Sequence, residues 1–460
     1  MHAAAPNDVR DHPQREGKNM AQKAAQPKGT RDFLPHTMRQ RSYVIETIAA
    51  IYRKHGFEPI ETPALENLDT LLGKYGEEGD QLLFRILKRG AKAGTGECDL
   101  GLRYDLTVPL ARFIAMHQND LPRIFKRYQI QPVWRADRPG HGRFREFYQC
   151  DIDVVGAQAP LADVDLLLAV VEVFDALAFN RLTLRLNDRR ILRGLIEVAG
   201  IDIGQETTAI VALDKLDKIG APGVETELQQ RGIPAAAAAS LLATLQDLQE
   251  APEILPRLEA LFADHPAALA GVHTLAQIQA AMAHQVSTST TLRVDPTLAR
   301  GLNYYTGPIF EIQSQDLGSS LAGGGRYDGL IGTFLGRDIP ACGVSLGLER
   351  ILVVMEERDA FPGLRMSSDL MVALFDESTT HHALTAATAL RAHGLEVDLY
   401  PQHDKMAKQF KYANERKIPW VLVIGPDEAK NDRVRLKRMH DGTHFDLSLA
   451  EVPAHIASER

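Results

Sequence analysis

Apolar and polar side chains alternate between residues 127 and 156 in a pattern that predicts two β-strands joined by a turn. The first strand is expected to end near Asp137, residues 138–143 to form the turn, and the second strand to run from Phe144 to about Val155. One face of the second strand is apolar. The opposite face carries Arg145, Phe147, Gln149, Asp151 and Asp153, and the first strand adds Arg127, Gln129, Gln131, Arg135 and Asp137.

This concentration of charged groups and amides has two interpretations. The face is either the solvated outer surface of a half-buried sheet or a surface against which a polar ligand binds. Periodicity alone does not separate the two. The mixture of guanidinium groups, carboxylates, an amide and a flat aromatic ring favours the second interpretation, because a nucleotide together with a zwitterionic second substrate would need all of these groups.

The flanking pattern predicts an α+β chain. A helix is expected over residues 38–55, a strand containing two prolines over 56–66, a strand over 101–107 followed by a helix to 117, and an apolar helix over 160–177. Proline cannot donate to a strand ladder, so the strand over 56–66 is expected at a sheet edge. Residues 182–187 predict a strand, after which Asp188 caps a helix. Thr107 fits the N-cap of its own helix.

The second half of the chain begins with a change of composition. Residues 201–285 are rich in Ala, Leu, Gln and Glu and predict a helical insertion. Strands are expected to return near 290–312. The glycine-rich run 321–330 could be taken for a phosphate loop, but the chain contains no GxxxxGK[ST] motif, and glycines that let the backbone approach a ligand explain the run better. A helix is expected from about 340 to 357, with Gly343, Gly347 and Arg350 on one face.

After a boundary at 362–369, strands and helices alternate and predict a separate α/β domain. The chain has 460 residues, which fits two or three domains, and its net charge of -8 restricts any contact with nucleic acid to local basic patches. Its three cysteines show no metal-ligand spacing and fit a reducing compartment. No apolar run is long enough for a membrane span, and residues 1–24 look like a disordered leader without the features of a secretory signal.

Several separated motifs resemble one family in the correct order. The arginine-containing strands of residues 127–156 resemble motif 2 of class II aminoacyl-tRNA synthetases, and FREFYQCDIDVVG resembles the histidine-specific members. The run RGLNYYTG, which begins at Arg300, is similar to the histidine signature, and GLER, which ends at Arg350, is similar to motif 3. The helix and edge strand near the N-terminus resemble motif 1 at a dimer interface. The resemblance implies an antiparallel class II sheet flanked by helices, with a helical insertion and a C-terminal α/β anticodon-binding domain.

The resemblance also implies roles for individual residues. Arg135 and Arg300 would act catalytically at the α-phosphate of ATP, while Arg143 and Arg350 would hold the β/γ end. Asp137 would read the adenine amino group and Phe147 would stack on the ring. The histidine-binding residues would be Asp105, Thr107, Gln149, Asp153, Arg300, Tyr304, Tyr305 and Tyr327, with Asp153 and Tyr305 on the imidazole. Read without the family, a tyrosine pair more often packs in a core. Asp105 and Asp137 stand where many relatives have Glu.

The expected protein is a histidine–tRNA ligase, a cytoplasmic homodimer that uses ATP with Mg²⁺, histidine and tRNA(His), with no membrane association and no identifiable metal ligands. Lys408, Lys411 and Arg416 would contact tRNA, although solvated helix faces explain them too. The insertion would lie near the tRNA acceptor arm or be purely structural. The expected domains are residues 25–200 and 287–362 for the catalytic core, 201–286 for the insertion and 368–460 for the C-terminal domain. Two alternative functions are considered: a non-catalytic paralogue that acts as a regulatory subunit, and a tRNA sensor.

Overall fold

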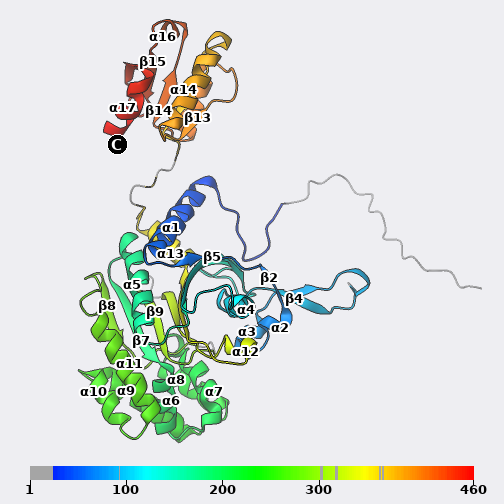
Figure 1. Ribbon diagram of the computed structural model, residues 1–460, viewed down its shortest axis with the longest axis vertical. Helices are drawn as coiled ribbons and strands as arrows, with labels where there is room; N and C mark the ends of the chain where they lie inside the picture. The colour runs from blue at the N-terminus through cyan, green and yellow to red at the C-terminus, as the bar shows by residue number, and fades with distance from the viewer. Residues whose placement is uncertain are drawn as a thin grey trace, which may run out of the picture.

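The computed structural model describes residues 24–92, 94–300, 304–315, 320–361, 364 and 367–459. The expected leader 1–24 therefore lies almost wholly outside the described residues. Two main sheets organise the described chain, one with eight strands and one with five, and a three-stranded sheet accompanies the larger one. Figure 1 shows the five-stranded unit, in orange and red, apart from the larger body. Among the described residues, no helix combines the length and apolar character needed to cross a bilayer.

The eight-stranded sheet carries the polar strands that the sequence pattern singled out. Its order is β1-β5-β6-β11-β10-β9-β7-β8, antiparallel except for the pairs β1/β5 and β7/β8. The strands are β1 (Glu58–Pro59), β5 (Phe125–Trp134), β6 (Glu146–Val155), β7 (Leu182–Asp188), β8 (Thr290–Val294), β9 (Pro308–Ser314), β10 (Ser320–Arg326) and β11 (Ala341–Gly347). The strand with two prolines forms the sheet edge, as expected, but only over the two residues of β1.

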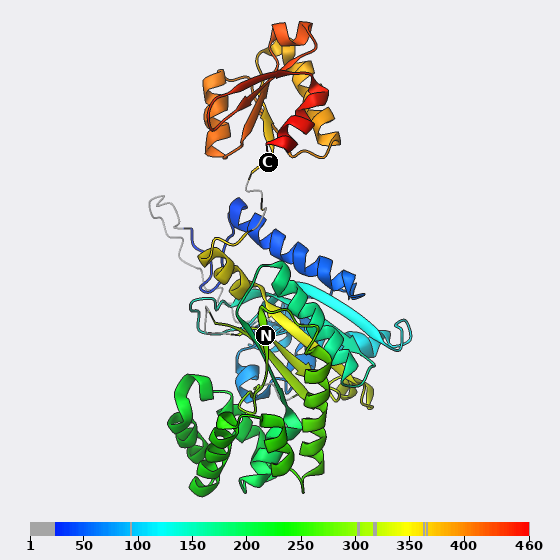
Figure 2. The ribbon, with the colours of Figure 1, turned by 90° about the vertical axis from the view of Figure 1, so that its left-hand side faces the viewer.

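Helices cover one face of this sheet and bury its apolar side chains. They are α1 (Pro35–Lys54), α5 (Leu161–Ala176), α6 (Arg189–Val198), α11 (Pro266–Met282) and α13 (Leu348–Glu357). Alternation sends Cys150, Ile152 and Val154 of β6 into this core. The opposite parity of β6 faces away from these helices, which leaves its carboxylates and amide on the other side of the sheet. Figure 2 shows α1 lying across one side of the large sheet.

Smaller elements close the other side. They are β2 (Leu65–Asn67), β3 (Arg85–Leu87) and β4 (Cys98–Leu102) in the three-stranded sheet, with α2 (Leu68–Leu71), α3 (Gly76–Gln81), η1 (Gly90–Lys92), α4 (Thr107–His117) and α12 (Gly332–Leu335). Helix α6 begins as the sequence predicts, because the Asp188 side chain accepts a hydrogen bond from the backbone N–H of Arg190 at 2.9 Å.

The predicted helical insertion is helical throughout its described elements. It contains η2 (Ile203–Gln205), α7 (Glu206–Leu213), α8 (Leu216–Gln230), α9 (Ala235–Glu250) and α10 (Ile254–Leu261), and α11 returns the chain to the sheet. Helix α8 is interrupted at Gly220, whose φ of 68° is in the left-handed region that glycine tolerates. The insertion gathers at the end of the body opposite the C-terminal unit (Figure 2).

The C-terminal unit alternates strands and helices as expected. Its sheet has the order β13-β12-β14-β15-β16. The elements are β12 (Leu370–Val372), η3 (Glu377–Thr379), α14 (Thr380–Ala392), β13 (Val397–Leu399), α15 (Met406–Glu415), β14 (Trp420–Val423), α16 (Pro426–Lys430), β15 (Val434–Arg438), β16 (His444–Leu447), η4 (Leu449–Glu451) and α17 (Val452–Ser458). Arg39 of α1 forms an ion pair of 3.0 Å with Glu396 of this unit.

The expected helix beginning near residue 340 is wrong in its first half. Residues 341–347 form β11, which pairs with β6 and β10, and only Leu348 begins the helix. Each glycine would cost about 1 kcal/mol inside a helix relative to alanine. In the strand, by contrast, Gly343 makes room for a neighbouring carboxylate, since a Cβ there would lie 1.9 Å from Oδ1 of Asp153. Gly343 and Arg350 therefore do not share a helical face.

The expected strand over residues 101–107 is also wrong for most of its length, because β4 spans Cys98–Leu102. Arg103 follows the end of β4 at Leu102, and its buried guanidinium donates to the carbonyl oxygens of Thr62 at 2.6 Å and Pro132 at 2.9 Å. Helix α4 begins at Thr107, but the Thr107 side chain makes no capping hydrogen bond. Oδ1 of Asp105 instead accepts from the backbone N–H of Val108 at 3.1 Å. The capping role predicted for Thr107 belongs to Asp105.

Candidate active site

The candidate residues of the large body come together in one cavity on the polar side of the eight-stranded sheet. The cavity has a volume of about 350 Å³. Its lining contains Asp105, Thr107, Arg135, Asp137, Arg143, Phe147, Gln149, Asp153, Arg300, Tyr304, Tyr305, Tyr327 and Arg350. They come from segments far apart in the sequence. The strand pairing of β6 with β5 and β11 joins the first half of the chain to the second.

Asp153 lies deep in the cavity and is held on two sides. Its Oδ2 is 2.8 Å from Nη2 of Arg127, and both side chains are almost fully buried. The Tyr327 hydroxyl donates a hydrogen bond to Oδ1 of Asp153. Burial raises the pKa of Asp153, and the Arg127 charge opposes that shift. The absence of a side chain at Gly343 leaves space for this carboxylate.

Several buried oxygen atoms of the cavity lining lack hydrogen-bond partners among the described residues, and one each belongs to Asp105 and Gln149. Oδ1 of Asp105 accepts from the Tyr75 hydroxyl at 3.0 Å, but its Oδ2 accepts none. Gln149 donates from Nε2 to the Ser345 hydroxyl at 2.7 Å, and its Oε1 accepts none. Buried acceptors without donors are costly. The two residues therefore offer acceptors to a ligand that brings N–H groups, such as an ammonium.

Guanidinium groups cluster in a second part of the cavity, separate from the buried acceptors of Asp105 and Gln149. Nε of Arg135 donates to the Tyr104 carbonyl at 2.9 Å, and its guanidinium lies 4.2 Å from the Tyr104 ring centroid and 5.2 Å from that of Phe147. Arg350 donates to the Ser320 carbonyl at 2.6 Å. Burial lowers the pKa of Arg350, and the positive charge of Arg143 lowers it further. Concentrated positive charge of this kind fits a polyanion.

Asp137 and Arg143 form an ion pair of 2.9 Å at the edge of the cavity. The Arg143 side chain is 58% exposed, whereas Asp137 is mostly buried. The pair joins the end of β5 to the turn, and the exposure of Arg143 leaves its guanidinium accessible to a ligand.

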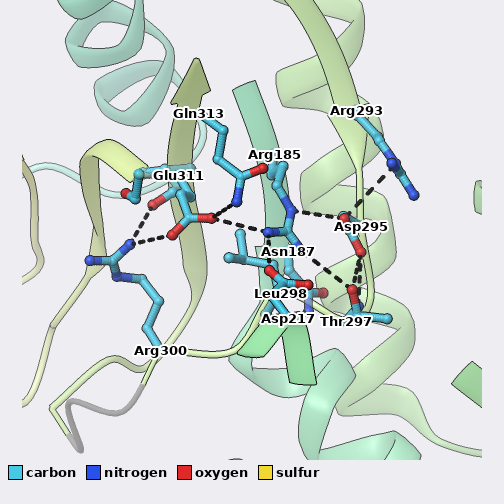
Figure 3. A network of polar contacts seen from close by, with 12 residues as sticks. Arg185, Asn187, Asp217, Arg293, Asp295, Thr297, Leu298, Arg300, Glu311 and Gln313 are labelled. Atoms are coloured by element: carbon cyan, nitrogen blue, oxygen red, sulfur yellow. Dashed lines mark hydrogen bonds and ion pairs between the residues drawn. The ribbon is translucent and has the colours of Figure 1, made fainter. Parts of the chain in front are cut away.

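Arg300 lines the cavity from the segment that follows β8, and Figure 3 shows its guanidinium directed toward Glu311. Its Nη1 lies 3.6 Å from Oε2 of Glu311 and 3.4 Å from the Phe310 carbonyl oxygen. A Cβ at Gly323 would lie 2.0 Å from Nη1, so this glycine gives the guanidinium its space. Residues 301–303 of the histidine signature lie outside the described residues, while Tyr304 and Tyr305 follow with ring centroids 4.9 Å apart.

Sequence reasoning assigned no role to several residues that line the cavity or hold its lining. Asp151 and Ser345 line it, and burial raises the pKa of Asp151 to about 7. Lys218 reaches it from the insertion, which the sequence pattern treated as having little chemistry. Glu349 also lines it and is neutralised by Arg31 and by Arg41, the latter at 2.7 Å. The alternation of side chains along β6 placed Asp151 on the polar face. The pairings of Glu349 with Arg31 and Arg41 join segments far apart in the sequence, and no local pattern reports them.

The candidate tRNA-contacting residues lie in the C-terminal unit, on or beside α15. Each has a carboxylate neighbour: Lys408 pairs with Asp404 at 3.0 Å, Lys411 with Glu415 at 3.7 Å and Arg416 with Asp398 at 3.4 Å. The side chains of Lys408 and Lys411 are 68% and 77% exposed, so exposed pairs of this kind are weak and solvated. The basic patch expected from sequence is therefore interleaved with acids.

The part of the chain that the structure describes contains no group of three or more His, Cys, Asp or Glu side chains able to hold a metal ion. The cavity carboxylates nearest the guanidinium cluster are already paired with arginines: Asp137 with Arg143, and Glu349 with Arg41. The described residues thus do not form a protein cage for a divalent cation.

Comparisons with known proteins match both the large body and the C-terminal unit of the chain. A family profile described as histidyl-tRNA synthetase matches residues 29–351, and one described as anticodon binding domain matches residues 369–459. A histidine–tRNA ligase of Cytophaga hutchinsonii is 42% identical over 94% of this chain and 99% of its own length. Another, of Christiangramia forsetii, is 41% identical over 93% of this chain and 98% of its own.

Among solved structures, the histidyl-tRNA synthetase from Nostoc sp. PCC 7120 superimposes with a TM-score of 0.80 at 30% identity, covering 95% of this chain and 99% of that one. The large sheet with its guanidinium-lined cavity, joined to an anticodon-binding domain, is the arrangement of an aminoacyl-tRNA synthetase. The chain belongs to the histidyl-tRNA synthetase family.

Proposed function

We propose that this protein activates histidine with ATP and transfers it to the 3′-terminal adenosine of tRNA(His). In the first step a carboxylate oxygen of histidine attacks the α-phosphorus, the bond to the β-phosphate oxygen breaks, and pyrophosphate leaves with that electron pair. In the second step a ribose hydroxyl attacks the carbonyl carbon of the adenylate, the bond from that carbon to the phosphate oxygen breaks, AMP leaves with the electron pair, and the hydroxyl proton is released. The observation that carries the proposal is one cavity that combines buried unpaired acceptors with clustered guanidinium groups.

Negative charge develops on the phosphate oxygens during the first step, so cations fixed beforehand stabilise the transition state. We assign Arg135 and Arg300 to the α-phosphate. The planar guanidinium group can bond two oxygen atoms, which suits it to this role. Arg350 and the exposed Arg143 would then hold the β- and γ-phosphates. Mg²⁺ would arrive with the phosphates of ATP, and no step is assigned to it.

The adenine ring would be read beside Arg135. Phe147 offers a flat surface for stacking, and Asp137 would accept from the adenine amino group. Asp137 is already paired with Arg143, so adenine would share this carboxylate with the guanidinium.

Histidine would lie between the unpaired acceptors and the buried carboxylate. Its ammonium fits Oδ2 of Asp105 and Oε1 of Gln149, with Thr107 beside them. Its imidazole nitrogens would bond Asp153 and Tyr305, while Tyr304 and Tyr327 enclose the ring. An amino acid without the imidazole N–H groups would leave these buried polar groups unpaired, which is a strong basis for selectivity.

We assign a separate role to each domain expected from the sequence. Residues 25–200 and 287–362 would form the catalytic core, residues 201–286 the insertion near the tRNA acceptor arm, and residues 368–460 the anticodon-binding domain. Lys408, Lys411 and Arg416 would contact the anticodon stem, exchanging their carboxylate neighbours for phosphates. The protein would work in the cytoplasm.

The protein would act as a homodimer formed around α1 and the edge strand β1. Exposed apolar side chains in this region support the proposal: Leu34 is 65% exposed and Leu65 47%. Light scattering on the purified protein measures the molar mass directly. Twice the chain mass is expected, and a monomer at working concentration would contradict the proposal.

The test of activation is exchange of labelled pyrophosphate into ATP, with each amino acid offered separately and no tRNA present. Exchange with histidine alone, lost in Arg300→Ala, is the expected result. Histidine binding without exchange would favour a regulatory paralogue or a tRNA sensor. Exchange with a different amino acid would contradict the imidazole assignment of Asp153 and Tyr305.

A further inference from the structure

The contacts that the Arg300 guanidinium makes with the Phe310 carbonyl and with Glu311 are long. Its Nη1 lies 3.4 Å from the Phe310 carbonyl oxygen and 3.6 Å from Oε2 of Glu311, and its buried Nε has no hydrogen-bond partner among the described residues. A side chain held in this way moves in response to small changes in its neighbours. Glu311 is the carboxylate paired with it, so the position of Glu311 bears directly on where Arg300 points.

Glu311 is itself shared with a second arginine. Its Oε1 lies 3.1 Å from Nη1 of Arg185 and accepts from Nε2 of Gln313 at 2.7 Å, while Oε2 faces Arg300 (Figure 3). The two guanidinium groups lie on opposite sides of one carboxylate. A stronger attraction of Glu311 to Arg185 therefore weakens its hold on Arg300.

Arg185 connects this carboxylate to the helical insertion. Its Nε lies 2.8 Å from Oδ2 of Asp295, and the same Nη1 that contacts Glu311 lies 2.9 Å from Oδ2 of Asp217. The Arg185 side chain is 8% exposed, so these charges interact with little solvent screening, whereas Asp217 is 64% exposed. Asp217 lies on the first turn of α8, before the interruption at Gly220.

The same turn of the insertion borders the catalytic cavity. Lys218 follows Asp217 and lines the cavity, and Asp214 at the end of α7 is close enough for the Arg300 charge to oppose the rise in its pKa that burial causes. Movement of this turn thus changes both the charge around Arg300 and the partner of Arg185.

We infer that Glu311 is a positioning residue for Arg300, and that Arg185 couples Glu311 to Asp217, so that the position of the helical insertion sets the position of the Arg300 guanidinium. This inference rests on the proposed assignment of Arg300 to the α-phosphate. Without Asp217, Arg185 loses one of its carboxylates and turns further toward Glu311, which releases Arg300. The insertion is then a regulator of the activation step as well as a structural subdomain.

The test is Asp217→Asn, because this exposed side chain can be changed with little effect on packing. We expect kcat for histidine-dependent pyrophosphate exchange to fall roughly 3- to 30-fold, with the KM for histidine unchanged. The matched control is Asp247→Asn, which removes an exposed ion pair of 2.7 Å with Arg257 in the same insertion, distant in the polar network from Arg185. The control is expected to behave as wild type, and Asp217→Glu to restore most of kcat.

Glu311→Gln tests the contact between Glu311 and Arg300. A measurement of nucleotide binding tests the inference without relying on catalytic turnover. Calorimetry should show weaker binding of ATP to Glu311→Gln and to Asp217→Asn, with binding of adenosine unchanged, because Arg300 is assigned to the phosphates of ATP and not to its adenosine. Equal behaviour of Asp217→Asn and Asp247→Asn in both assays would overturn the inference. Failure of the wild-type protein to exchange with any amino acid would instead contradict the proposed function, while the ATP-against-adenosine comparison would still decide the coupling.

Discussion

Replacing Arg127 with glutamine tests how the buried carboxylate of the cavity is maintained. Arg127 has no exposed surface, and its Nη2 lies 2.8 Å from Oδ2 of Asp153, whose side chain is 3% exposed. Its other contacts are weaker, to Oε1 of Gln129 at 3.3 Å and to the Leu106 carbonyl at 3.4 Å. Arg127→Gln removes the positive charge and leaves Asp153 buried with only the Tyr327 hydroxyl as donor.

The expected loss of stability is large. Removing one partner of a buried ion pair costs about 3–5 kcal/mol, because the remaining charge is left uncompensated. Folded domains have a total free energy of unfolding of about 5–15 kcal/mol, so the variant is expected to fold with much reduced stability. As a control, Arg193→Gln removes an exposed ion pair of 3.2 Å with Glu197 and should change stability by less than about 1 kcal/mol.

The stability that Arg127→Gln loses relative to wild type should also depend on pH, in a direction that the pKa of Asp153 decides. Burial already raises the pKa of Asp153 above its ordinary value, and loss of Arg127 raises it further. A raised pKa in the folded state means that stability is complete at low pH and is lost as pH rises through the folded pKa. The difference between variant and wild type should therefore grow as pH rises and shrink as pH falls toward the ordinary pKa of an aspartate.

Urea unfolding at a series of pH values, followed by circular dichroism, measures this difference. The KM for histidine in pyrophosphate exchange should rise together with the stability loss, because Arg127 no longer holds the Asp153 carboxylate in the position proposed for binding the imidazole. A deficit below about 1 kcal/mol, in the range of an exposed pair, or one that stays constant across the pH series, would refute the reasoning.

Three further substitutions test separate parts of the cavity. Gly323→Ala places a Cβ 2.0 Å from Nη1 of Arg300, so the guanidinium must move, and we expect the exchange rate to fall about 10- to 100-fold in a folded protein; an unchanged rate would contradict that position. Burial raises the pKa of Asp151 to about 7, so the ionised form costs stability as pH rises through that value, and Asp151→Asn should be more stable than wild type above it in thermal unfolding but not below it. Arg350→Lys should raise the KM for ATP about tenfold, because lysine cannot bond two phosphate oxygens, and a larger effect on the KM for histidine would count against the phosphate role.

The alternation along residues 127–156 was sufficient to predict the paired strands and the polar face, because period-two patterning follows directly from strand geometry. The same reasoning placed Gln149 and Asp153 on the ligand side, where they line the cavity. It failed for residues 341–347, where glycine spacing suggested a helix although the segment is a strand between two others. Strand pairing over a long sequence separation decided that segment, and no local pattern reports it.

Contacts between distant segments were the other feature that sequence did not reveal. Arg127 shares its face with other polar residues of β5, but its pairing with Asp153 depends on the register of two strands. Lys218 reaches the cavity only because the insertion folds back beside Arg300. The motifs identified chemical groups that line the cavity, whereas the residues that hold those groups in place required the structure.

The most direct test of the account is attachment of labelled histidine to tRNA(His) by the purified protein in the presence of ATP and Mg²⁺. We predict acid-precipitable histidine that accumulates to about one per tRNA and is lost when Gln149 is replaced by alanine, because the ammonium then loses a buried acceptor. The absence of charging, with histidine and ATP both bound, would contradict the claim that this cavity activates histidine for transfer.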